Sequence, residues 1–172
     1  PQTTMPTSYI KKILNARVYD VAVETPLMPM AQMSLRAGNT VLLKREDLQP
    51  VYSFKIRGAY NKMAGLSEQA LARGVVAASA GNHAQGVALA AKELGAKATI
   101  VMPLTTPAIK VNAVRARGAR VILHGDTYDE AAGYAWQLVE DKGMTYVPPY
   151  DDPEVIAGQG TVGMEILHQH KD

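Results

Sequence analysis

The sequence predicts an α/β protein of two lobes, in which parallel or mixed β-sheets are covered by helices. From Val75 onward, short runs of β-branched residues alternate with amphipathic stretches, and Gly95, Gly118 and Gly143 close these stretches. Strands that are separated by helices need crossover connections, which favour a parallel sheet covered on both faces. Prolines interrupt this alternation toward both ends of the chain. We therefore expect the two ends to meet in a second, discontinuous lobe.

The composition narrows the class of protein further. The chain has 172 residues, of which 47% are hydrophobic and 20% are charged, so it is long enough to bury a core. A net charge of +2 without a basic block argues against nucleic acid as a partner. The chain contains no cysteine, which excludes a disulfide framework, a thiol nucleophile and a cysteine zinc site.

The same features bear on the cellular location. A chain without cysteine suits a reducing compartment. No apolar run approaches the length of a membrane span, and Pro1-Gln2-Thr3-Thr4 lacks the basic-then-apolar order of a secretory signal. We expect a cytoplasmic protein that does not contact a membrane. A plastid or another organelle, reached after removal of a transit peptide, is the alternative.

Residues 53–147 are expected to form the smaller α/β lobe, with elements that alternate in order. The first helix after Val75 places small side chains on one face, which predicts close packing of that helix on the sheet. Those side chains are Ala84, Val87, Ala88 and Ala91. The expected strands are 75–79, 98–102, 120–123 and 145–147.

Two further helices of this lobe have recognisable starts. Thr106 and Pro107 suit the N-cap and the first helical position of a helix that continues to Arg117. The sequence Thr127-x-x-Glu130 is a capping box, which predicts that the next helix begins there. Side-chain caps of this kind satisfy backbone N–H groups that have no partner inside the helix.

The two ends are expected to belong to the larger lobe. Residues 1–52 form its N-terminal part, with a short helix near 8–16 and a strand at 41–44. Residues 148–172 begin its remaining part, with a helix that starts at Asp152-Pro153 and runs to about Gln169. The rest of this lobe is expected to lie outside the chain.

Lys55 is the candidate nucleophile. It follows Ser53 and Phe54 where a helix is expected to begin. The positive end of a helix dipole disfavours the ammonium ion and raises the fraction of neutral amine. Neutral amines attack aldehydes, so this lysine could capture a carbonyl cofactor as a Schiff base. The alternative is a solvated surface lysine.

The segment from Ser79 to Gly86 is the candidate binding loop. It lies where a strand ends and a helix begins, which is where open parallel sheets bind ligands. Free backbone N–H groups at such a turn attract a carboxylate or a phosphate, and Gly81 allows close approach. The alternative is a simple strand-to-helix turn with Asn82 as the cap. No Gly-Lys-Ser/Thr follows, so this is not a Walker loop.

Two other patterns suggest ligands but have simpler explanations. Residues 158–163 match the dinucleotide fingerprint G-x-G-x-x-G, but no strand runs directly into them. We interpret them as a glycine-rich helix packed tightly against a neighbour. His168 and His170 lie two residues apart, so on a helix they point in different directions, and we expect no metal site.

Several motifs, taken together and in order, resemble the threonine/serine dehydratase family of pyridoxal-phosphate enzymes. The sequence of residues 18–20 and 44–50 is most similar to that of the biosynthetic threonine deaminases of this family. The resemblance covers nearly the whole chain. It implies a fold of the tryptophan-synthase-β type, with the cofactor between two α/β lobes. The motifs are Lys44-Arg45-Glu46-Asp47, Ser53-Phe54-Lys55-Ile56-Arg57-Gly58-Ala59, Ser79-Ala80-Gly81-Asn82-His83-Ala84-Gln85-Gly86 and Gly158-Gln159-Gly160-Thr161.

The resemblance also implies roles for particular residues. Lys55 would form the Schiff base with pyridoxal 5'-phosphate and later remove the α-proton of the substrate. Phe54 would lie against the cofactor ring, and Asn82 would hydrogen-bond its hydroxyl group. The residues expected around the substrate carboxylate are Ser79, Gly81, Asn82, His83 and Ala84.

The implied reaction converts L-threonine to 2-oxobutanoate, the precursor of isoleucine, and ammonia. Three alternatives stay open: a catabolic dehydratase acting on L-serine or L-threonine, a serine racemase, and a non-catalytic lobe. The last is motivated by the family's glycine-rich phosphate loop, which is expected beyond Asp172. An uncovered last helix would leave an apolar surface, so we expect a homo-oligomer.

Overall fold

The computed structural model describes residues 6–170 and contains a four-stranded parallel sheet with the strand order β5-β4-β3-β6. The four predicted strands are confirmed, although the first and the last each end one residue earlier than expected. The first residues, on which the expectation about a secretory signal depends, lie outside the described part. The strands are β3 (Val75–Ala78), β4 (Ala98–Met102), β5 (Arg120–Leu123) and β6 (Thr145–Tyr146).

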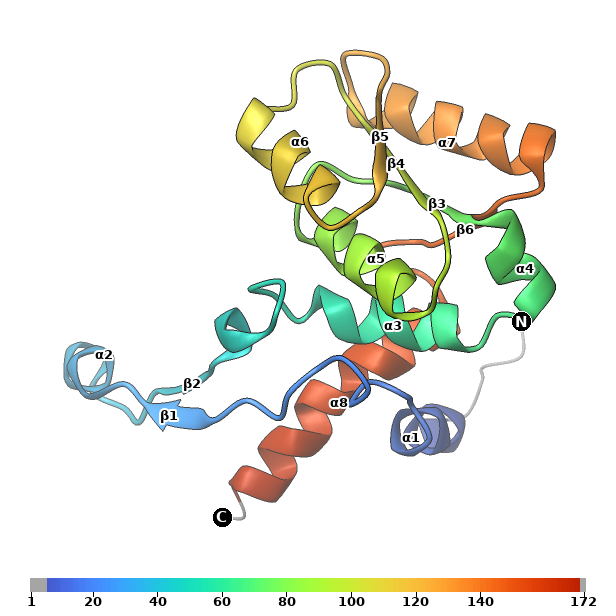
Figure 1. Ribbon diagram of the computed structural model, residues 1–172. Coiled ribbons are helices and arrows are strands. Elements are labelled where there is room, and N and C mark those ends of the chain that lie inside the picture. Colours follow the sequence, from blue (N-terminus) through green and yellow to red (C-terminus); the bar gives the residue numbers. More distant parts are fainter. Residues whose placement is uncertain (1–5, 171–172) are drawn as a thin grey trace.

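Helices cover both faces of this sheet, as predicted (Figure 1). Strand residues alternate between the two faces, so β3 contributes to two separate cores. Val75 and Ala77 pack with α5 (Asn82–Glu93) and α6 (Ala108–Arg115), whereas Val76 and Ala78 pack with α7 (Tyr128–Lys142). The crossover connections therefore give a three-layered α/β/α unit.

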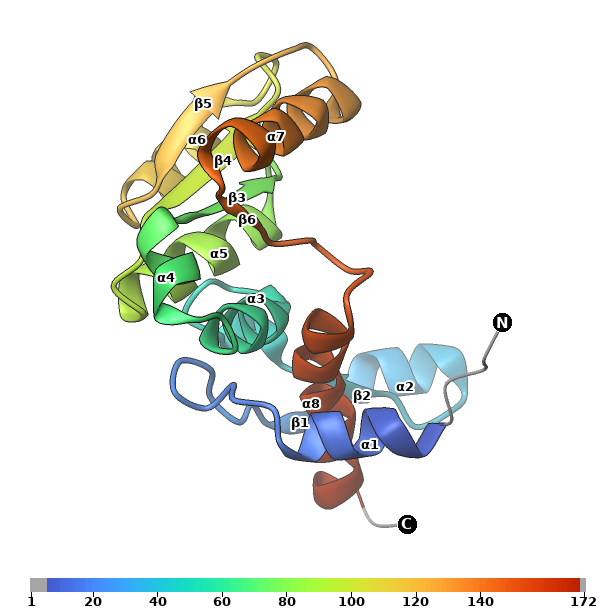
Figure 2. The ribbon, with the colours of Figure 1, turned by 90° about the vertical axis from the view of Figure 1, so that its right-hand side faces the viewer.

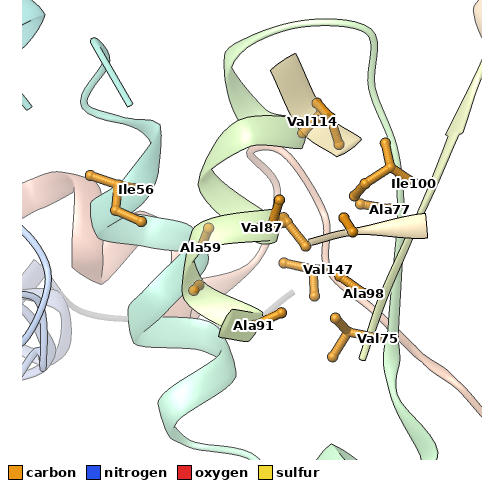
Figure 3. Packing of buried hydrophobic residues seen from close by; sticks show 14 of the residues in the cluster. Ile56, Ala59, Val75, Ala77, Val87, Ala91, Ala98, Ile100, Val114 and Val147 are labelled. Atoms are coloured by element: carbon orange, nitrogen blue, oxygen red, sulfur yellow. The ribbon is translucent and has the colours of Figure 1, made fainter. Parts of the chain in front are cut away.

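The first of these helices packs closely on the sheet. Figure 3 shows Val87 and Ala91 of α5 directed toward β3 and β4, while Ala59 of α3 (Lys55–Ala64) lies on the opposite side of α5. The small residues predicted to pack this helix closely on the sheet are all at most 2% exposed. α5 is thus enclosed between the sheet and α3. The burial of Ala84, Val87, Ala88 and Ala91 confirms the expected close contact.

One of the two predicted helix starts in this unit is confirmed, and the other is wrong. Thr127 and Glu130 form the reciprocal capping box at the start of α7, as predicted. The prediction for α6 is wrong, because its N-cap is Pro107, the helix begins at Ala108 and no side chain caps it. Asp152 caps α8 (Pro153–Gln169) by accepting hydrogen bonds from two backbone N–H groups.

Segments from both ends of the chain gather on the side of α3 that faces away from α5 (Figure 2). There α8 packs against α3 and α1 (Pro6–Leu14), which begins two residues earlier than expected. An antiparallel pair, β1 (Leu27–Pro29) with β2 (Leu42–Lys44), projects sideways, and α2 connects the two strands at their outer end (Figure 1). The sequence analysis did not predict α2 (Ala31–Ala37), the 3-10 helix η1 (Glu46–Leu48) or α4 (Glu68–Arg73). Within residues 6–170, no helix is both long and apolar enough to cross a membrane.

Candidate active site

The candidate site lies at the carboxyl ends of β3 and β6, which are neighbours in the sheet. From β3 the chain continues through α5 to β4 on one side, whereas β6 lies on the other side and leads toward α8. The strand order therefore reverses at β3, and open α/β sheets bind ligands at such reversals. Both the candidate loop after β3 and the linker between β6 and α8 begin here.

Lys55 is the first residue of α3, as predicted. Its backbone N–H donates to Oγ of Ser53 at 3.3 Å, and its Nζ atom lies 5.5 Å from the centroid of the Phe54 ring. Nζ donates a hydrogen bond of 2.6 Å to the backbone carbonyl of Pro149, in the linker after β6. The amine is therefore directed across the site and not into solvent.

The environment of Lys55 favours the neutral amine. Burial lowers the pKa of the half-buried Lys55 amine below its ordinary value. The helix-dipole argument predicted the same direction, and the structure supplies burial as the cause. A lowered pKa increases the fraction of nucleophilic amine at neutral pH.

Two glycines allow neighbouring helices to approach the first turn of α3. A Cβ atom on Gly86 of α5 would lie 3.1 Å from the Lys55 carbonyl oxygen. A Cβ atom on Gly158 of α8 would lie 2.6 Å from the Arg57 carbonyl oxygen, closer than real Cβ contacts. The interpretation of residues 158–163 as a glycine-rich helix packed against a neighbour is confirmed. Helices on both sides thus hold the backbone that carries Lys55.

The loop after β3 presents backbone N–H groups. Gly81 is the N-cap of α5 and Asn82 is its first residue, so the alternative in which Asn82 caps the helix is wrong. The Asn82 side chain is exposed, and Ser79 Oγ accepts from the Gly81 N–H at 3.2 Å. The Gln85 N–H donates to the Gly81 carbonyl, which is the first hydrogen bond of α5. The backbone N–H groups before Gln85 have no carbonyl partner inside the helix, so they point out of its N-terminal end. A Cβ atom on Gly81 would meet no atom within 4 Å, so this side of the loop is open.

His83 is a buried polar residue of the candidate loop, and Ala84 is buried beside it. The His83 Nε2 atom lies 2.9 Å from the Val147 carbonyl oxygen, and Nδ1 is buried without a hydrogen-bond partner. Burial lowers the pKa of His83 to about 4, although the bond to Val147 opposes this shift. The ring is therefore neutral at pH 7, so Nε2 carries the proton and Nδ1 has a free lone pair.

The linker after β6 is the part of the site that the sequence analysis missed. Its backbone carbonyls, from Val147 and Pro149, accept from His83 and Lys55 respectively. Pro148-Pro149 was evident as an interruption of the α/β alternation, but a carbonyl acceptor has no side-chain signature. Phe54 lies beside this region and contributes to a cavity of about 380 Å³ with Gln159 and Val162 of α8.

His168 is exposed near the end of α8, and His170 follows its last residue. Throughout residues 6–170, no group of three or more histidine, aspartate or glutamate side chains has an arrangement that could hold a metal ion.

Comparison with known proteins gives a family and relatives. A family model described as pyridoxal-phosphate dependent enzyme matches residues 18–172. L-threonine dehydratase biosynthetic IlvA of Burkholderia multivorans is 60% identical over 166 residues, which are 95% of this chain and 33% of the relative. Threonine dehydratase 1 biosynthetic, chloroplastic, of Solanum lycopersicum is 60% identical over 164 residues, which are 95% of this chain and 27% of the relative. The chain thus spans a third or less of the length of these relatives.

Solved structures share the fold. The processed form of threonine deaminase isoform 2 from Solanum lycopersicum matches with a TM-score of 0.93 and 55% identity, over 96% of this chain and 46% of that chain. Serine racemase from Dictyostelium discoideum matches with a TM-score of 0.87 and 34% identity, over 95% of this chain and 54% of that chain. The predicted α/β class, with a parallel sheet covered by helices, is confirmed, and the chain is shorter than the proteins that share its fold.

Proposed function

The chain belongs to the family of pyridoxal-phosphate-dependent enzymes, and on that premise we propose that it supplies the reactive lysine and the substrate-binding loop of a threonine ammonia-lyase. The reaction is the conversion of L-threonine to 2-oxobutanoate and ammonia, which would serve isoleucine biosynthesis. One observation carries the proposal: a half-buried lysine amine with a lowered pKa lies at the reversal of the strand order. Identities of 60% to biosynthetic threonine dehydratases support this choice of substrate.

The residues at the site suit pyridoxal phosphate. Lys55 would hold the cofactor aldehyde covalently, because burial favours its neutral amine. Phe54 would lie against the ring, and the exposed Asn82 would reach its hydroxyl group. When bound, the cofactor supplies an electron-withdrawing ring that stabilises negative charge on the substrate α-carbon. The orphaned Nδ1 of His83 offers one more polar contact in this region.

The residues of the chain would divide the remaining tasks. The open end of α5 would bind the substrate carboxylate through the N–H groups of its first turn, next to the positive end of the helix dipole. Once released from the cofactor, the Lys55 amine would accept the α-proton at Nζ. Fixed positions of amine and carboxylate would direct the α-hydrogen toward Nζ. The residues that we place around the carboxylate are Ser79, Gly81, Asn82, His83 and Ala84.

The proposal includes the division of the chain between two lobes. Residues 53–147 would form the smaller lobe, and residues 1–52 and 148–172 would belong to the larger one. The packing of α1 with α8, on the side of α3 that faces away from α5, supports this division. The carbonyls of Val147 and Pro149 would then lie at the boundary between the lobes. We also propose that the protein self-associates, because α8 exposes the apolar side chains of Ile156 and Leu167.

Chemical trapping tests the cofactor proposal directly. The chain is incubated with pyridoxal phosphate, reduced with borohydride and digested, and the labelled peptide is identified by mass spectrometry. We expect the label on Lys55 and a visible absorption band before reduction, both absent from Lys55→Ala. Lys62→Ala is the matched control, because Lys62 lies two turns further along the same helix and pairs with Asp152. Labelling that is unchanged in Lys55→Ala would refute the role of Lys55.

Product analysis tests the substrate. We expect 2-oxobutanoate from L-threonine to exceed pyruvate from L-serine, measured in the longest polypeptide that the gene encodes and in the 172-residue chain. Formation of D-serine as the main product would favour a serine racemase instead. If the longest polypeptide traps the cofactor but forms neither 2-oxo acid nor D-serine, the non-catalytic alternative is correct.

A further inference from the structure

Arg57 lies two residues after Lys55 in the first turn of α3 and is completely buried. Its Nε and Nη2 atoms donate to the two carboxylate oxygens of Glu46 at 2.9 and 2.8 Å. From the other side, its Nη1 and Nη2 atoms donate to the carboxylate of Glu165 at 2.5 and 2.9 Å. An arginine can be buried only when its donors are satisfied, and here two carboxylates satisfy them in a planar arrangement.

The cluster around Arg57 balances its charges. Lys44 Nζ lies 2.6 Å from Glu165 Oε2, and Tyr19 donates its hydroxyl to Glu165 Oε1 at 2.8 Å. Burial alone would raise the pKa of Glu165, but hydrogen bonds from Arg57, Lys44 and Tyr19 hold that pKa below its ordinary value. The Glu165 carboxylate is therefore ionised, and it lies between Arg57 and Lys44. The cluster joins η1, β2 and α8 to the first turn of α3.

The cluster also connects to Lys55 through α8 and the linker before it. Nη1 of Arg57 donates to Thr161 Oγ1 at 3.0 Å, and the Arg57 carbonyl lies against Gly158. Thr161 and Gly158 both belong to α8. The carbonyl of Pro149, which accepts from Lys55, lies in the linker that leads into this helix. Thr161 and Glu165, which accept from Arg57, and Pro149, which accepts from Lys55, thus belong to one continuous stretch of chain.

We propose that Arg57 is the positioning residue for Lys55. By joining the first turn of α3 to η1 and α8, it keeps the Lys55 amine half-buried and directed at the Pro149 carbonyl. The inference rests on the proposed function, in which Lys55 is the reactive lysine. Arg57 itself touches neither cofactor nor substrate in this scheme.

A measurable consequence follows for the ionisation of Lys55. Without Arg57 the first turn of α3 can shift outward, and a more exposed amine has a pKa closer to its ordinary value. The charged groups that face this turn are Glu46 from η1 and Glu165 from α8, both paired with Arg57. His83 from α5 faces the amine as a neutral ring, because burial lowers its pKa to about 4. The exposure of the Lys55 amine therefore controls its pKa.

The test measures the pH dependence of cofactor trapping at Lys55. Borohydride trapping of pyridoxal phosphate on the full chain is followed over a series of pH values for the wild type, Arg57→Lys and Arg57→Met/Glu165→Gln. The double variant keeps the cluster charge-balanced, with Lys44 and Glu46 remaining. We expect the midpoint of trapping to move to higher pH in the double variant, by about one unit, which lowers trapping at neutral pH about tenfold. Arg57→Lys should show a smaller change in the trapping midpoint than the double variant.

Lys62→Met is the matched control, because the Lys62–Asp152 ion pair also joins α3 to α8 but lies further from Lys55. It should lower the melting temperature and leave the trapping midpoint unchanged. An unchanged midpoint in both folded Arg57 variants would overturn the inference and would show that Arg57 only stabilises the fold. A variant that circular dichroism shows to be unfolded is replaced by Glu46→Gln, judged by the same midpoint. Absence of trapping in the wild type would instead refute the proposed function.

Discussion

The Nζ atom of Lys55 donates a hydrogen bond of 2.6 Å to the backbone carbonyl oxygen of Pro149, a residue 94 positions further along the chain. This bond spans the boundary between the sheet-containing unit and the segment that leads to α8. Reaction of the amine with an aldehyde would release water and replace N–H bonds of Nζ by a C=N bond, so this hydrogen bond would change. Under the proposed function, cofactor capture would therefore alter the contact between Lys55 and the segment that leads to α8.

Lys55→Met should abolish cofactor trapping with little effect on stability. The variant loses the hydrogen bond to Pro149 but also removes a partly desolvated ammonium group, and these two effects oppose each other. We expect the free energy of unfolding to change by less than about 1 kcal/mol. Urea denaturation measures this change, and a loss of more than about 3 kcal/mol would show that the lysine has mainly a structural role.

Gly158→Ala should destabilise the protein. The added Cβ atom would lie 2.6 Å from the carbonyl oxygen of Arg57, and two packed helices cannot easily move apart. We expect a loss of about 2 kcal/mol or more in the free energy of unfolding. Gly163→Ala is the matched control on the same helix, because its Cβ atom would meet nothing within 4 Å. That variant should be neutral or more stable by up to about 1 kcal/mol, and equal effects of the two would contradict the crossing geometry.

The stability of the protein should fall in mild acid because of His83. Burial lowers the pKa of His83 to about 4 in the folded protein, from 6.5 in the unfolded chain. As the pH falls, the unfolded chain binds the proton first, so the contribution of His83 is complete above pH 6.5 and is lost as the pH falls through 4. The loss is about 3 kcal/mol.

Denaturation curves collected at several pH values measure this effect. His83→Asn should remove this part of the pH dependence. His124→Asn should retain it, because His124 is exposed and stacks on Tyr134 outside the site. A pH dependence that is identical in the wild type and His83→Asn would contradict the burial of a neutral ring.

Thr127→Ala should weaken the start of α7. The Thr127 side chain accepts from the Glu130 N–H, and the Glu130 carboxylate accepts from the Thr127 N–H. We expect a loss of about 1 kcal/mol in the free energy of unfolding. Thr106→Ala is the comparison at α6, where no side chain caps the helix, and it should change the stability by less than about 0.5 kcal/mol. Thermal melts of the two variants distinguish a real cap from a sequence pattern that resembles one.

Most of the sheet-containing unit could be predicted from the sequence. The four strands and the helices between them follow from patterns a few residues long, and the capping box of α7 involves residues only three positions apart. Lys55 at a helix start, directly after a serine and a phenylalanine, was also a local feature. Where the local pattern was ambiguous the prediction was wrong, as at Thr106, because a threonine before a proline can precede a helix without capping it.

Only the tertiary structure determined what surrounds Lys55. The carbonyl of Pro149, the burial that lowers the lysine pKa and the approach of Gly158 depend on segments about a hundred positions away. The sequence showed Arg57 as one residue of a motif, whereas the fold buries it between Glu46 and Glu165. Periodicity and caps depend on neighbours along the chain, so the sequence specified the four strands of the sheet and most of the helices around it. The pairing of distant surfaces depends on shape and desolvation, so the reactive environment of the lysine arises only when the folded helices meet.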